Sequence, residues 1–384
     1  MGSDRTGPSP RAGSMAASLA ILCMVTGSLP ATSNAQELTI ENVAADRAAF
    51  LPSAGEVTAV SFRLSQPADV EMRIYDSRDL LVRTVKTDAT LPAGDASLSW
   101  DGRSDWNEAV PAEAYFYTLT ASSPNGGVVA HDLTDLTRGE DTAIAELAYD
   151  RSERVVRYVL PGPSRVGIRI GVGNSGAMLA TIVNWEPRAD VAVEEAWDGI
   201  DGIAVEALEL HGQYFRFPDN AVIVRPEPGK PFSREFVRQA SERRQRTVRK
   251  RQMYQHSEHL RDQSYDFPVT LELERGVTEH RDGLPVVGDG AVISIDVPPE
   301  DRQFVQSQRI EIVFFLDGVF ITEIEQGFLP VRWPLRSLAA PEGEHMLTVN
   351  LRGYEGYFGC ASIRFVKSSD ASSSTAAAAQ GAAR

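Results

Sequence analysis

The sequence predicts an all-β protein built from tandem β-sandwiches with one basic helical insert. Three observations lead to this fold class. Short stretches of alternating apolar and polar residues recur along most of the chain, and Trp-Asp-Gly occurs twice, about a hundred residues apart. One stretch is also strongly basic in a chain whose net charge is −15. Alternation with a period of two is typical of half-buried strands, and 384 residues suffice for two or three domains.

The first strand-rich unit begins near Val60 with "VSFRLSQPADVEMRIYD". Apolar residues alternate on both sides of Pro67, which predicts two strands joined by a turn. Three more predicted strands follow, "LLVRTV", "DASLSW" after a Pro-Ala-Gly turn, and "AYFYTLTAS". The unit therefore reads as a small β-domain.

A second unit repeats this pattern at a nearly constant offset. A shift of 96 residues aligns Phe62 with Tyr158, Leu64 with Leu160, Pro67 with Pro163, Val70 with Val166, Met72 with Ile168, Arg73 with Arg169 and Ile74 with Ile170. A shift of 97 aligns Leu81 with Met178, Val85 with Ile182, and Trp100, Asp101 and Gly102 with Trp197, Asp198 and Gly199. The period equals a whole small β-domain, so we expect a domain duplication and not a solenoid.

Residues 55–122 resemble the immunoglobulin-like domain of flagellar hook-capping (FlgD-type) proteins. The resemblance rests on "FRLSQPADVEMRIYD", "LVRTV", "AGDASLSWDG" and "AYFYTLTA"; Ala114 stands where that family usually has glycine. The second copy is more divergent, and its "GQYFRF" at 212–217 resembles the closing strand of the family. The helical N-terminal region of a hook-cap protein is missing. The resemblance therefore implies a sandwich fold and an envelope context, not a flagellar function.

A third unit follows from Val292 with two predicted strands in "RIEIVFFLDGVFI", joined by Asp317-Gly318, a hairpin signal. "EGEHMLTVNLRGYEGY" and "CASIRFV" add two more strands. This layout is similar to bacterial Ig-like domains of surface proteins, which again implies a β-sandwich.

The two Trp-Asp-Gly sites allow two interpretations. A tryptophan beside an Asp-Gly turn can be a core anchor, because glycine accepts a positive φ and aspartate bonds its own turn. An exposed tryptophan could instead stack on a ligand. The pattern favours structural anchors: Trp100, Asp101, Gly102, Trp197, Asp198 and Gly199.

The basic stretch at 234–262 has nine basic and four acidic residues, so its net charge is +5. Ser233 can cap a helix here, but the stretch has little apolar face to bury. One interpretation is a solvated helical linker. The other is a docking element for an acidic protein or anionic lipid headgroups. Its candidate docking residues are Arg243, Arg244, Arg246, Arg249, Lys250 and Arg251.

The N-terminus has the pattern of an export signal: Arg5 and Arg11, a short apolar stretch, and small residues before a possible cleavage site after Ala35. An uncleaved anchor is the alternative. Cleavage would leave Cys360 as the one remaining cysteine, and we expect it to be a small buried residue. The predicted segments are a signal peptide at 1–35, β-domains at 36–135 and 145–230, a basic linker at 231–265, a third β-domain at 266–368 and a disordered tail at 369–384.

Catalytic motifs are weak. His256 and His259 flank Glu258, but "HSEH" is not a zinc-protease motif. "GVGNSG" at 171–176 lacks the lysine and helix of a phosphate loop, and Asp101 and Asp105 are turn carboxylates that could at most bind calcium. We expect no enzyme activity, no cofactor and no metal, and the acidic charge disfavours nucleic acid as a partner.

The sequence thus predicts an exported structural or accessory protein, periplasmic or on the cell surface. It would dock on a membrane or envelope complex through its β-modules and basic helix. The alternative is a glycan-binding surface module, which needs solvent-facing aromatic side chains. Its candidates are Trp106, Trp185 and Trp333.

Overall fold

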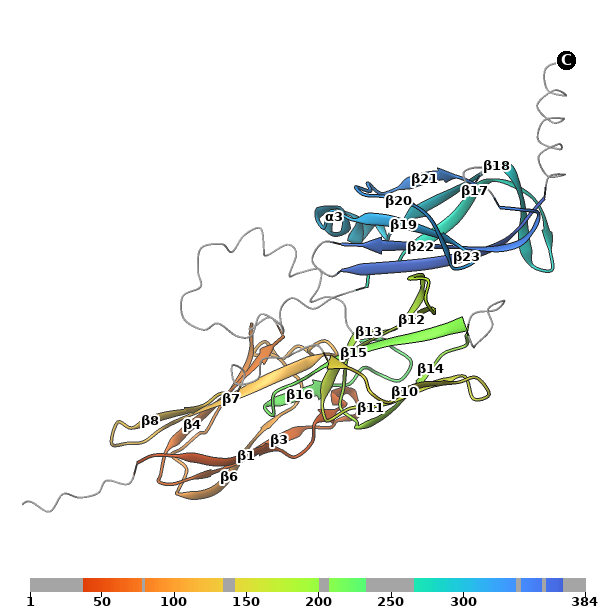
Figure 1. Ribbon diagram of the computed structural model, residues 1–384. Coiled ribbons are helices and arrows are strands. Elements are labelled where there is room, and N and C mark those ends of the chain that lie inside the picture. The colour runs from red at the N-terminus through yellow and green to blue at the C-terminus, as the bar shows by residue number, and fades with distance from the viewer. Residues whose placement is uncertain are drawn as a thin grey trace, which may run out of the picture. The chain divides into compact units, whose positions relative to one another are not determined.

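A computed structural model describes residues 37–77, 80–133, 142–199, 207–232, 266–335, 340–353 and 357–368 (Figure 1). The prediction of an all-β fold is confirmed, since strands dominate and α3 (Pro299–Ser307) is the one α-helix in the part just defined. The predicted signal peptide at 1–35, nearly all of the predicted basic linker and all of the predicted tail lie outside these residues. We call the described parts of 37–133, 142–232 and 266–368 the first, second and third modules.

The first module is a sandwich of two antiparallel sheets. One sheet has the order β1-β3-β6, and the other contains β7-β4-β5, with β8 paired to β7. The chain changes sheets between β3 and β4, at the turn that Pro67 marks. Alternating residues of both sheets, such as Phe62 and Met72, form its core. The elements are β1 (Ile40–Ala45), β2 (Ala49–Phe50), a 3-10 turn η1 (Pro52–Ala54), β3 (Thr58–Leu64), β4 (Asp69–Asp76), β5 (Leu81–Lys86), β6 (Gly94–Trp100), β7 (Ala114–Ser122) and β8 (Val128–His131).

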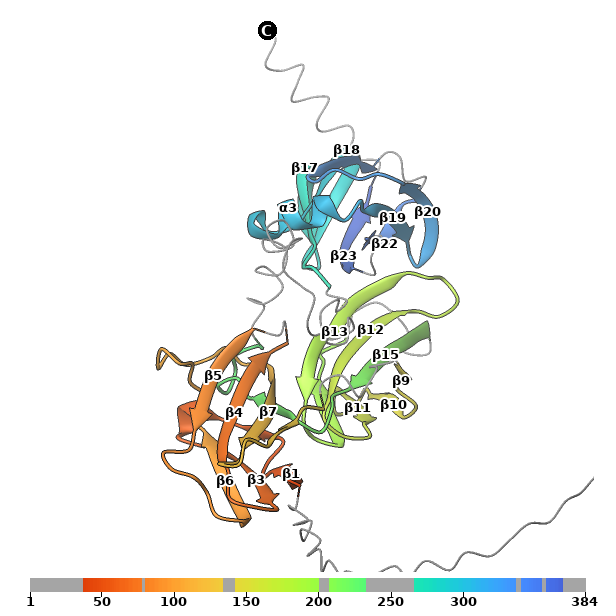
Figure 2. The ribbon, with the colours of Figure 1, turned by 90° about the vertical axis from the view of Figure 1, so that its left-hand side faces the viewer.

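The second module has the same strand order as the first (Figure 2). Its sheets are β10-β11-β14 and β13-β12-β15, with β9 at the edge of the latter. The strands that the offset of 96 to 97 residues makes equivalent therefore occupy equivalent places. The elements are β9 (Thr142–Ala143), β10 (Leu147–Asp150), β11 (Val155–Val159), β12 (Ser164–Val172), β13 (Met178–Arg188), β14 (Ala192–Ala196), β15 (Leu208–Arg216) and β16 (Ala221–Val224).

The last of these strands, β16, does not join the second module's sheets. It lies between β2 and β7 and so extends the first module's sheet. All four of its residues are buried: Val222 and Val224 face the first module's core, and Ala221 and Ile223 face a cluster shared with the second module. An unbroken apolar strand is expected where both faces of a sheet are covered. The predicted second domain, 145–230, therefore includes a strand that pairs with the first module's sheet.

All seven strands of the third module belong to one sheet, which runs β17-β18-β23-β22-β19-β20 with β21 paired to β18. The predicted hairpin at Asp317-Gly318 is present, with φ angles of 51° and 79°. Helix α3 was not predicted, although a Pro at its start followed by Glu300 and Asp301 is a helix N-terminal signal. The strands are β17 (Thr270–Arg281), β18 (Leu284–Asp296), β19 (Glu311–Leu316), β20 (Val319–Ile324), β21 (Val331–Pro334), β22 (Gly343–Arg352) and β23 (Phe358–Lys367).

Candidate functional site

Strand β12 carries two arginines on the side of its sheet that faces away from the second module's core. Val166, Ile168 and Ile170 point into apolar clusters, as the period of two requires. Arg165 and Arg169 lie on the opposite side, with Gly167 between them. Arg165 contacts the first module and Arg169 contacts the third, so this face of the sheet takes part in two contacts between modules.

Arg165 is fully buried and pairs with Glu113, whose side chain is only 4% exposed. Its guanidinium also donates to the Trp185 carbonyl at 2.9 Å and lies 5.5 Å from the centroid of the Phe217 ring. Breaking such a pair by removing one partner leaves an uncompensated buried charge. The contact therefore fixes the first module against the second.

A β-bulge opposite Gly167 shapes the middle of this face. Val166 pairs with Glu186 and Ile168 with Val183, so Asn184 and Trp185 together oppose one residue. Trp185 has a φ of 52°, and its indole packs directly over Gly167, where an added Cβ would lie 2.7 Å from the ring. A bulge re-aims side chains, and here it buries Trp185 and places Asn184 near Asp266.

Asp266, the first described residue after the basic stretch, is held by this face. It accepts hydrogen bonds from both Nε and Nη2 of Arg169 and from the Thr181 hydroxyl. The Asn184 side chain bonds the Asp266 backbone twice, accepting from its N–H at 2.9 Å and donating to its carbonyl at 2.6 Å. Asp266 is 4% exposed. It also bridges to Phe358 of the third module, whose ring lies 4.4 Å from the Arg169 guanidinium carbon.

Phe232, the last described residue before the basic stretch, also contacts the second module. The Phe232 ring lies 5.6 Å from the guanidinium carbon of Arg188, at the end of β13. Asp266 meets Asn184 on the same strand. The two contacts on β13 are thus four residues apart, about 13 Å at most. The 33 residues between Phe232 and Asp266 could span about 110 Å if extended, far more than the separation of these two contacts. So long a segment is therefore not needed to connect the two contacts.

The six predicted docking residues, Arg243, Arg244, Arg246, Arg249, Lys250 and Arg251, lie outside the described residues, as do His256 and His259. Sequence reasoning identified this stretch but not its attachment. Arg165, Arg169, Glu113 and Asp266 carried no sequence signal. Arg169 had been aligned only as the equivalent of Arg73.

The two Trp-Asp-Gly sites differ in burial. Trp100 is 2% exposed and makes edge contacts with Phe50 and Tyr115, and its indole N–H donates to the Arg103 carbonyl at 2.9 Å. Asp101 accepts a hydrogen bond from the N–H of Arg103, two residues along its own turn.

Trp197 is only partly buried, against Tyr149. Asp198 is almost fully exposed beside Arg154, 3.6 Å away. Gly102 and Gly199 both have positive φ, at 74° and 85°, as an Asp-Gly turn requires.

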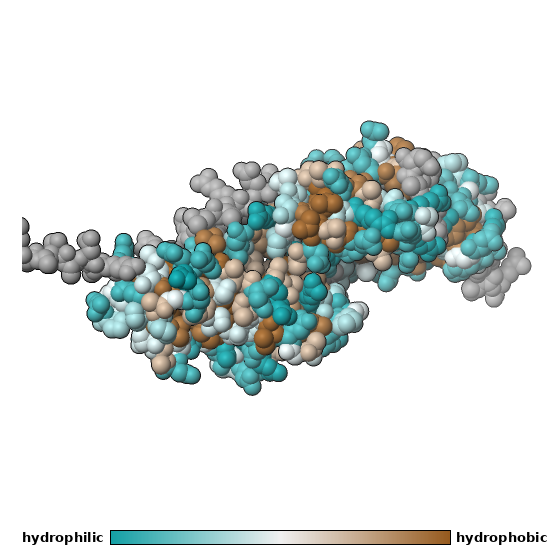
Figure 3. All heavy atoms as spheres, turned by 90° about the horizontal axis from the view of Figure 1, so that it is seen from below, coloured by the Kyte–Doolittle hydropathy of each residue, from teal (hydrophilic) through white to brown (hydrophobic). Residues whose placement is uncertain are grey.

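The three tryptophans proposed for ligand stacking also differ. Trp106 is 77% exposed, whereas Trp185 is 6% exposed. Trp333 is half-buried and stacks on Phe314 with ring centroids 4.3 Å apart. The candidacy of Trp185 was therefore wrong, because its ring is buried, whereas Trp333 has one ring face covered by Phe314. On the face seen in Figure 3, hydrophobic residues form small patches between hydrophilic ones.

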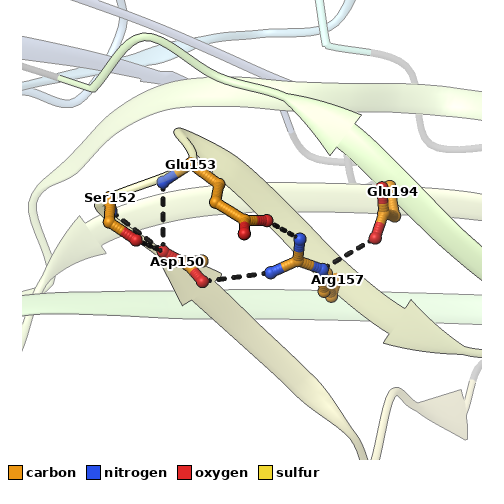
Figure 4. Close-up of polar contacts among 5 residues, drawn as sticks. All are labelled: Asp150, Ser152, Glu153, Arg157 and Glu194. Carbon is orange, nitrogen blue, oxygen red and sulfur yellow. Dashed lines mark hydrogen bonds and ion pairs between the residues drawn. The ribbon is translucent and has the colours of Figure 1, made fainter.

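An exposed charge cluster lies on the other sheet of the second module (Figure 4). Arg157 contacts three carboxylates, Asp150 at 3.1 Å, Glu194 at 2.7 Å and Glu153. Asp150 also accepts from the Ser152 hydroxyl and from two backbone N–H groups, and these bonds lower the pKa of its carboxyl. One arginine thus pairs with all three carboxylates, and the four side chains together carry a net charge of −2. Over the described ranges, no group of three His, Cys, Asp or Glu side chains could hold a metal ion.

The remaining chemical candidates have structural partners. "GVGNSG" forms the turn between β12 and β13. Asp105 caps the edge of β5: its N–H donates to the Val82 carbonyl at 2.9 Å, and its carboxylate accepts from the Thr84 N–H at 3.0 Å. Burial raises the pKa of the Cys360 thiol to about 12, next to Asp266 and Thr181, so this thiol is a poor nucleophile.

An open depression of about 510 Å³ lies between β9, β12, β13 and β15, lined among others by Trp185, Met178, His211 and Gln213. Its charged member, Arg169, is engaged by Asp266, so the lining presents no catalytic arrangement. Within the described portion, no helix is long and apolar enough to cross a membrane.

Comparisons agree with the fold of the first module. Residues 49–126 match the family model of the FlgD Ig-like domain. The solved structure of FlgD from P. aeruginosa aligns with 25% of this chain and 67% of that one, at 21% identity and a TM-score of 0.20.

Fibronectin(III)-like modules of Clostridium thermocellum CbhA align with 87% of this chain and 95% of that one, at 12% identity and a TM-score of 0.18. A bacterial ice-binding adhesin structure aligns with 86% and 98%, at 10% identity and a TM-score of 0.17. A search of curated proteins finds no match.

Proposed function

We propose that the chain is a non-enzymatic, exported accessory protein that docks on a bacterial membrane or cell-envelope complex through its basic stretch. In this proposal its second module is a divergent copy of the FlgD-type domain, and its third is a bacterial Ig-like domain. The identical strand order of the first two modules supports the duplication. The absence of a catalytic arrangement from the described residues is consistent with a scaffold.

One observation carries the docking role: the basic stretch is flanked by two residues fixed on the second module, Phe232 and Asp266. The stretch has a net charge of +5, and both of these flanking residues contact strand β13. The remainder of the chain carries about −20, since −15 minus +5 is −20, so this stretch differs from everything around it. It suits an acidic protein surface or anionic headgroups.

The test compares two variants with the same change in charge. In the docking variant, Arg243, Arg244, Arg246, Arg249, Lys250 and Arg251 are replaced by Gln. In the control variant, six basic residues with side chains more than half exposed are replaced by Gln: Arg63, Lys86, Arg154, Arg216, Lys230 and Arg281.

Each tagged protein is incubated with the membrane fraction of its source and, separately, with vesicles containing phosphatidylglycerol. The proposal expects binding by the wild type and the control variant, release by high salt, and loss of binding in the docking variant. Binding to the fraction but not to vesicles indicates a protein partner; binding to both indicates lipid headgroups. Equal binding by both variants would refute the docking role.

Trp106 supports a second candidate, a glycan-binding module, because a flat ring that is 77% exposed can stack on a sugar. Trp106 is the most exposed of the three candidate tryptophans. Quenching of its fluorescence by glycans, absent in Trp106→Phe, would support it.

A further inference from the structure

The third module contacts the second through a hairpin end. The β12–β13 hairpin of the second module presents Val172 and Ala177 to Val313 and Phe315 of β19. Leu179 packs on Met346 of β22. In the side-chain orientation that satisfies both of its amide atoms, Asn350 bonds the N–H and carbonyl of Met178 at 3.0 and 2.8 Å. One hairpin end thus sits on the outer face of one sheet.

The first module has an equivalent hairpin end. The β4–β5 hairpin occupies the place of β12–β13, and Leu81 is the equivalent of Met178. Leu81 is 46% exposed. Trp106 follows Asp105, whose N–H bonds the carbonyl of Val82, the residue after Leu81. In the second module this hairpin end contacts the sheet of the third module. In the first module the equivalent region carries an exposed leucine and an exposed tryptophan.

The third module's outer face also continues beyond its internal contact. Phe315 is buried against the second module, and its ring makes an edge contact with Phe320 on β20, centroids 6.2 Å apart. Phe320 is 53% exposed, whereas Val319 pairs with Leu316 and so lies on the opposite face. β20 is the terminal strand in its sheet order. Glu323 pairs with Val313 and so lies on this same face, exposed.

From this we infer that the first module's hairpin end, with Leu81 and Trp106, docks on the β20 part of the third module's outer face in a second copy of the chain. The contact repeats, between chains, the hairpin-on-sheet contact formed within one chain. The exposed Arg103, in the loop of Trp106, supplies a charge opposite to that of Glu323. The two surfaces differ, so the association is head-to-tail and adds copies in a row.

The test uses sedimentation velocity of the full chain over a hundredfold range of concentration. We expect the sedimentation coefficient of the wild type to rise with concentration. Trp106→Ala and Phe320→Ser should each stay monomeric alone. An equimolar mixture of the two should form 1:1 dimers and nothing larger, because each variant retains one intact surface. Val128→Ser, at a 67% exposed residue of β8, is the matched control and should associate like the wild type.

Thermal unfolding checks that both variants fold, and Trp106→Phe should restore part of the association. A wild type that remains monomeric over the whole range would overturn the inference. So would a monomeric wild type whose tryptophan fluorescence is quenched by glycans through Trp106. Dimers in either single variant alone would also overturn it, because they would show a symmetric contact. None of these outcomes affects the basic stretch, whose test is separate.

Discussion

The first two modules share one strand order but use the same sheet face differently. In the first module, Arg73 on β4 belongs to an exposed network in which Glu71 pairs with both Arg73 and Lys86. In the second, the residues equivalent to Asp69, Glu71 and Arg73 are Arg165, Gly167 and Arg169. Arg165 pairs with Glu113 of the first module, Gly167 lies under the Trp185 indole, and Arg169 pairs with Asp266. The second module differs from the first at the positions where its outer face forms junctions.

The largest expected difference between the two faces follows from removing the carboxylate that pairs with an arginine on each: Glu113, which pairs with Arg165, and Glu71, which pairs with Arg73. Glu113→Ala strands Arg165 in the interior and should lower the free energy of unfolding by about 3–5 kcal/mol. Glu71→Ala removes the acid from the equivalent solvent-facing network and should cost about 0–1 kcal/mol. Urea denaturation measures both. Similar losses would mean that the two faces are energetically alike.

The two Trp-Asp-Gly sites offer a second comparison. Trp100→Ala empties a fully packed site and should cost roughly 3–5 kcal/mol. Trp197→Ala should cost about half as much, since its ring is only partly buried. Denaturation monitored by circular dichroism separates them; an equal cost would contradict the difference in burial.

Gly167 tests the bulge. Gly167→Ala forces a Cβ to within 2.7 Å of Trp185 and should cost about 1–3 kcal/mol. Gly290→Ala is the control, because nothing lies within 4 Å of its added Cβ, and should change stability by less than about 0.5 kcal/mol. Thermal unfolding compares the two. A neutral Gly167→Ala would show that Trp185 moves freely.

Cys360 reports whether the junction with the third module opens. Cys360 is only partly buried, not buried as predicted, but the raised pKa of its thiol, about 12, predicts slow alkylation at pH 8. Asp266→Asn weakens a charged pair by about 1.5–3 kcal/mol, so labelling should accelerate roughly ten- to hundredfold. Mass spectrometry distinguishes the Cys360 peptide from that of Cys23. An unchanged rate would mean that Asp266 does not hold the junction closed.

The smallest effect is a pH dependence of the first module's face. A hydrogen bond from Lys86, followed by the charge of Arg73, lowers the pKa of Glu71 below 4.5. A lowered folded-state pKa contributes stability above the unfolded value, and that contribution is lost as pH falls through the folded pKa. Glu71→Gln should therefore flatten the loss of stability below about pH 4.5. An identical acid profile in both proteins would contradict this assignment.

Strand positions and the shared strand order of the first two modules could be predicted because a period of two and an offset of 96 to 97 can be read directly from the sequence. The junctions could not. Arg165 and Arg169 look like ordinary outward residues of a strand, and only tertiary structure shows which neighbour covers them. β16 was assigned to the second module by proximity in sequence, yet its continuous apolar run fits a strand covered on both faces. The basic stretch was found from charge alone, without its attachment points.

The central claim is that the basic stretch attaches this scaffold to an envelope complex. The most direct measurement is purification of the native chain from the membrane fraction of its source, at low and at high salt, with mass spectrometry of the proteins that accompany it. If the basic stretch attaches the chain, a defined set of partners accompanies it at low salt and is released at high salt. A lone chain at both salt concentrations would contradict it.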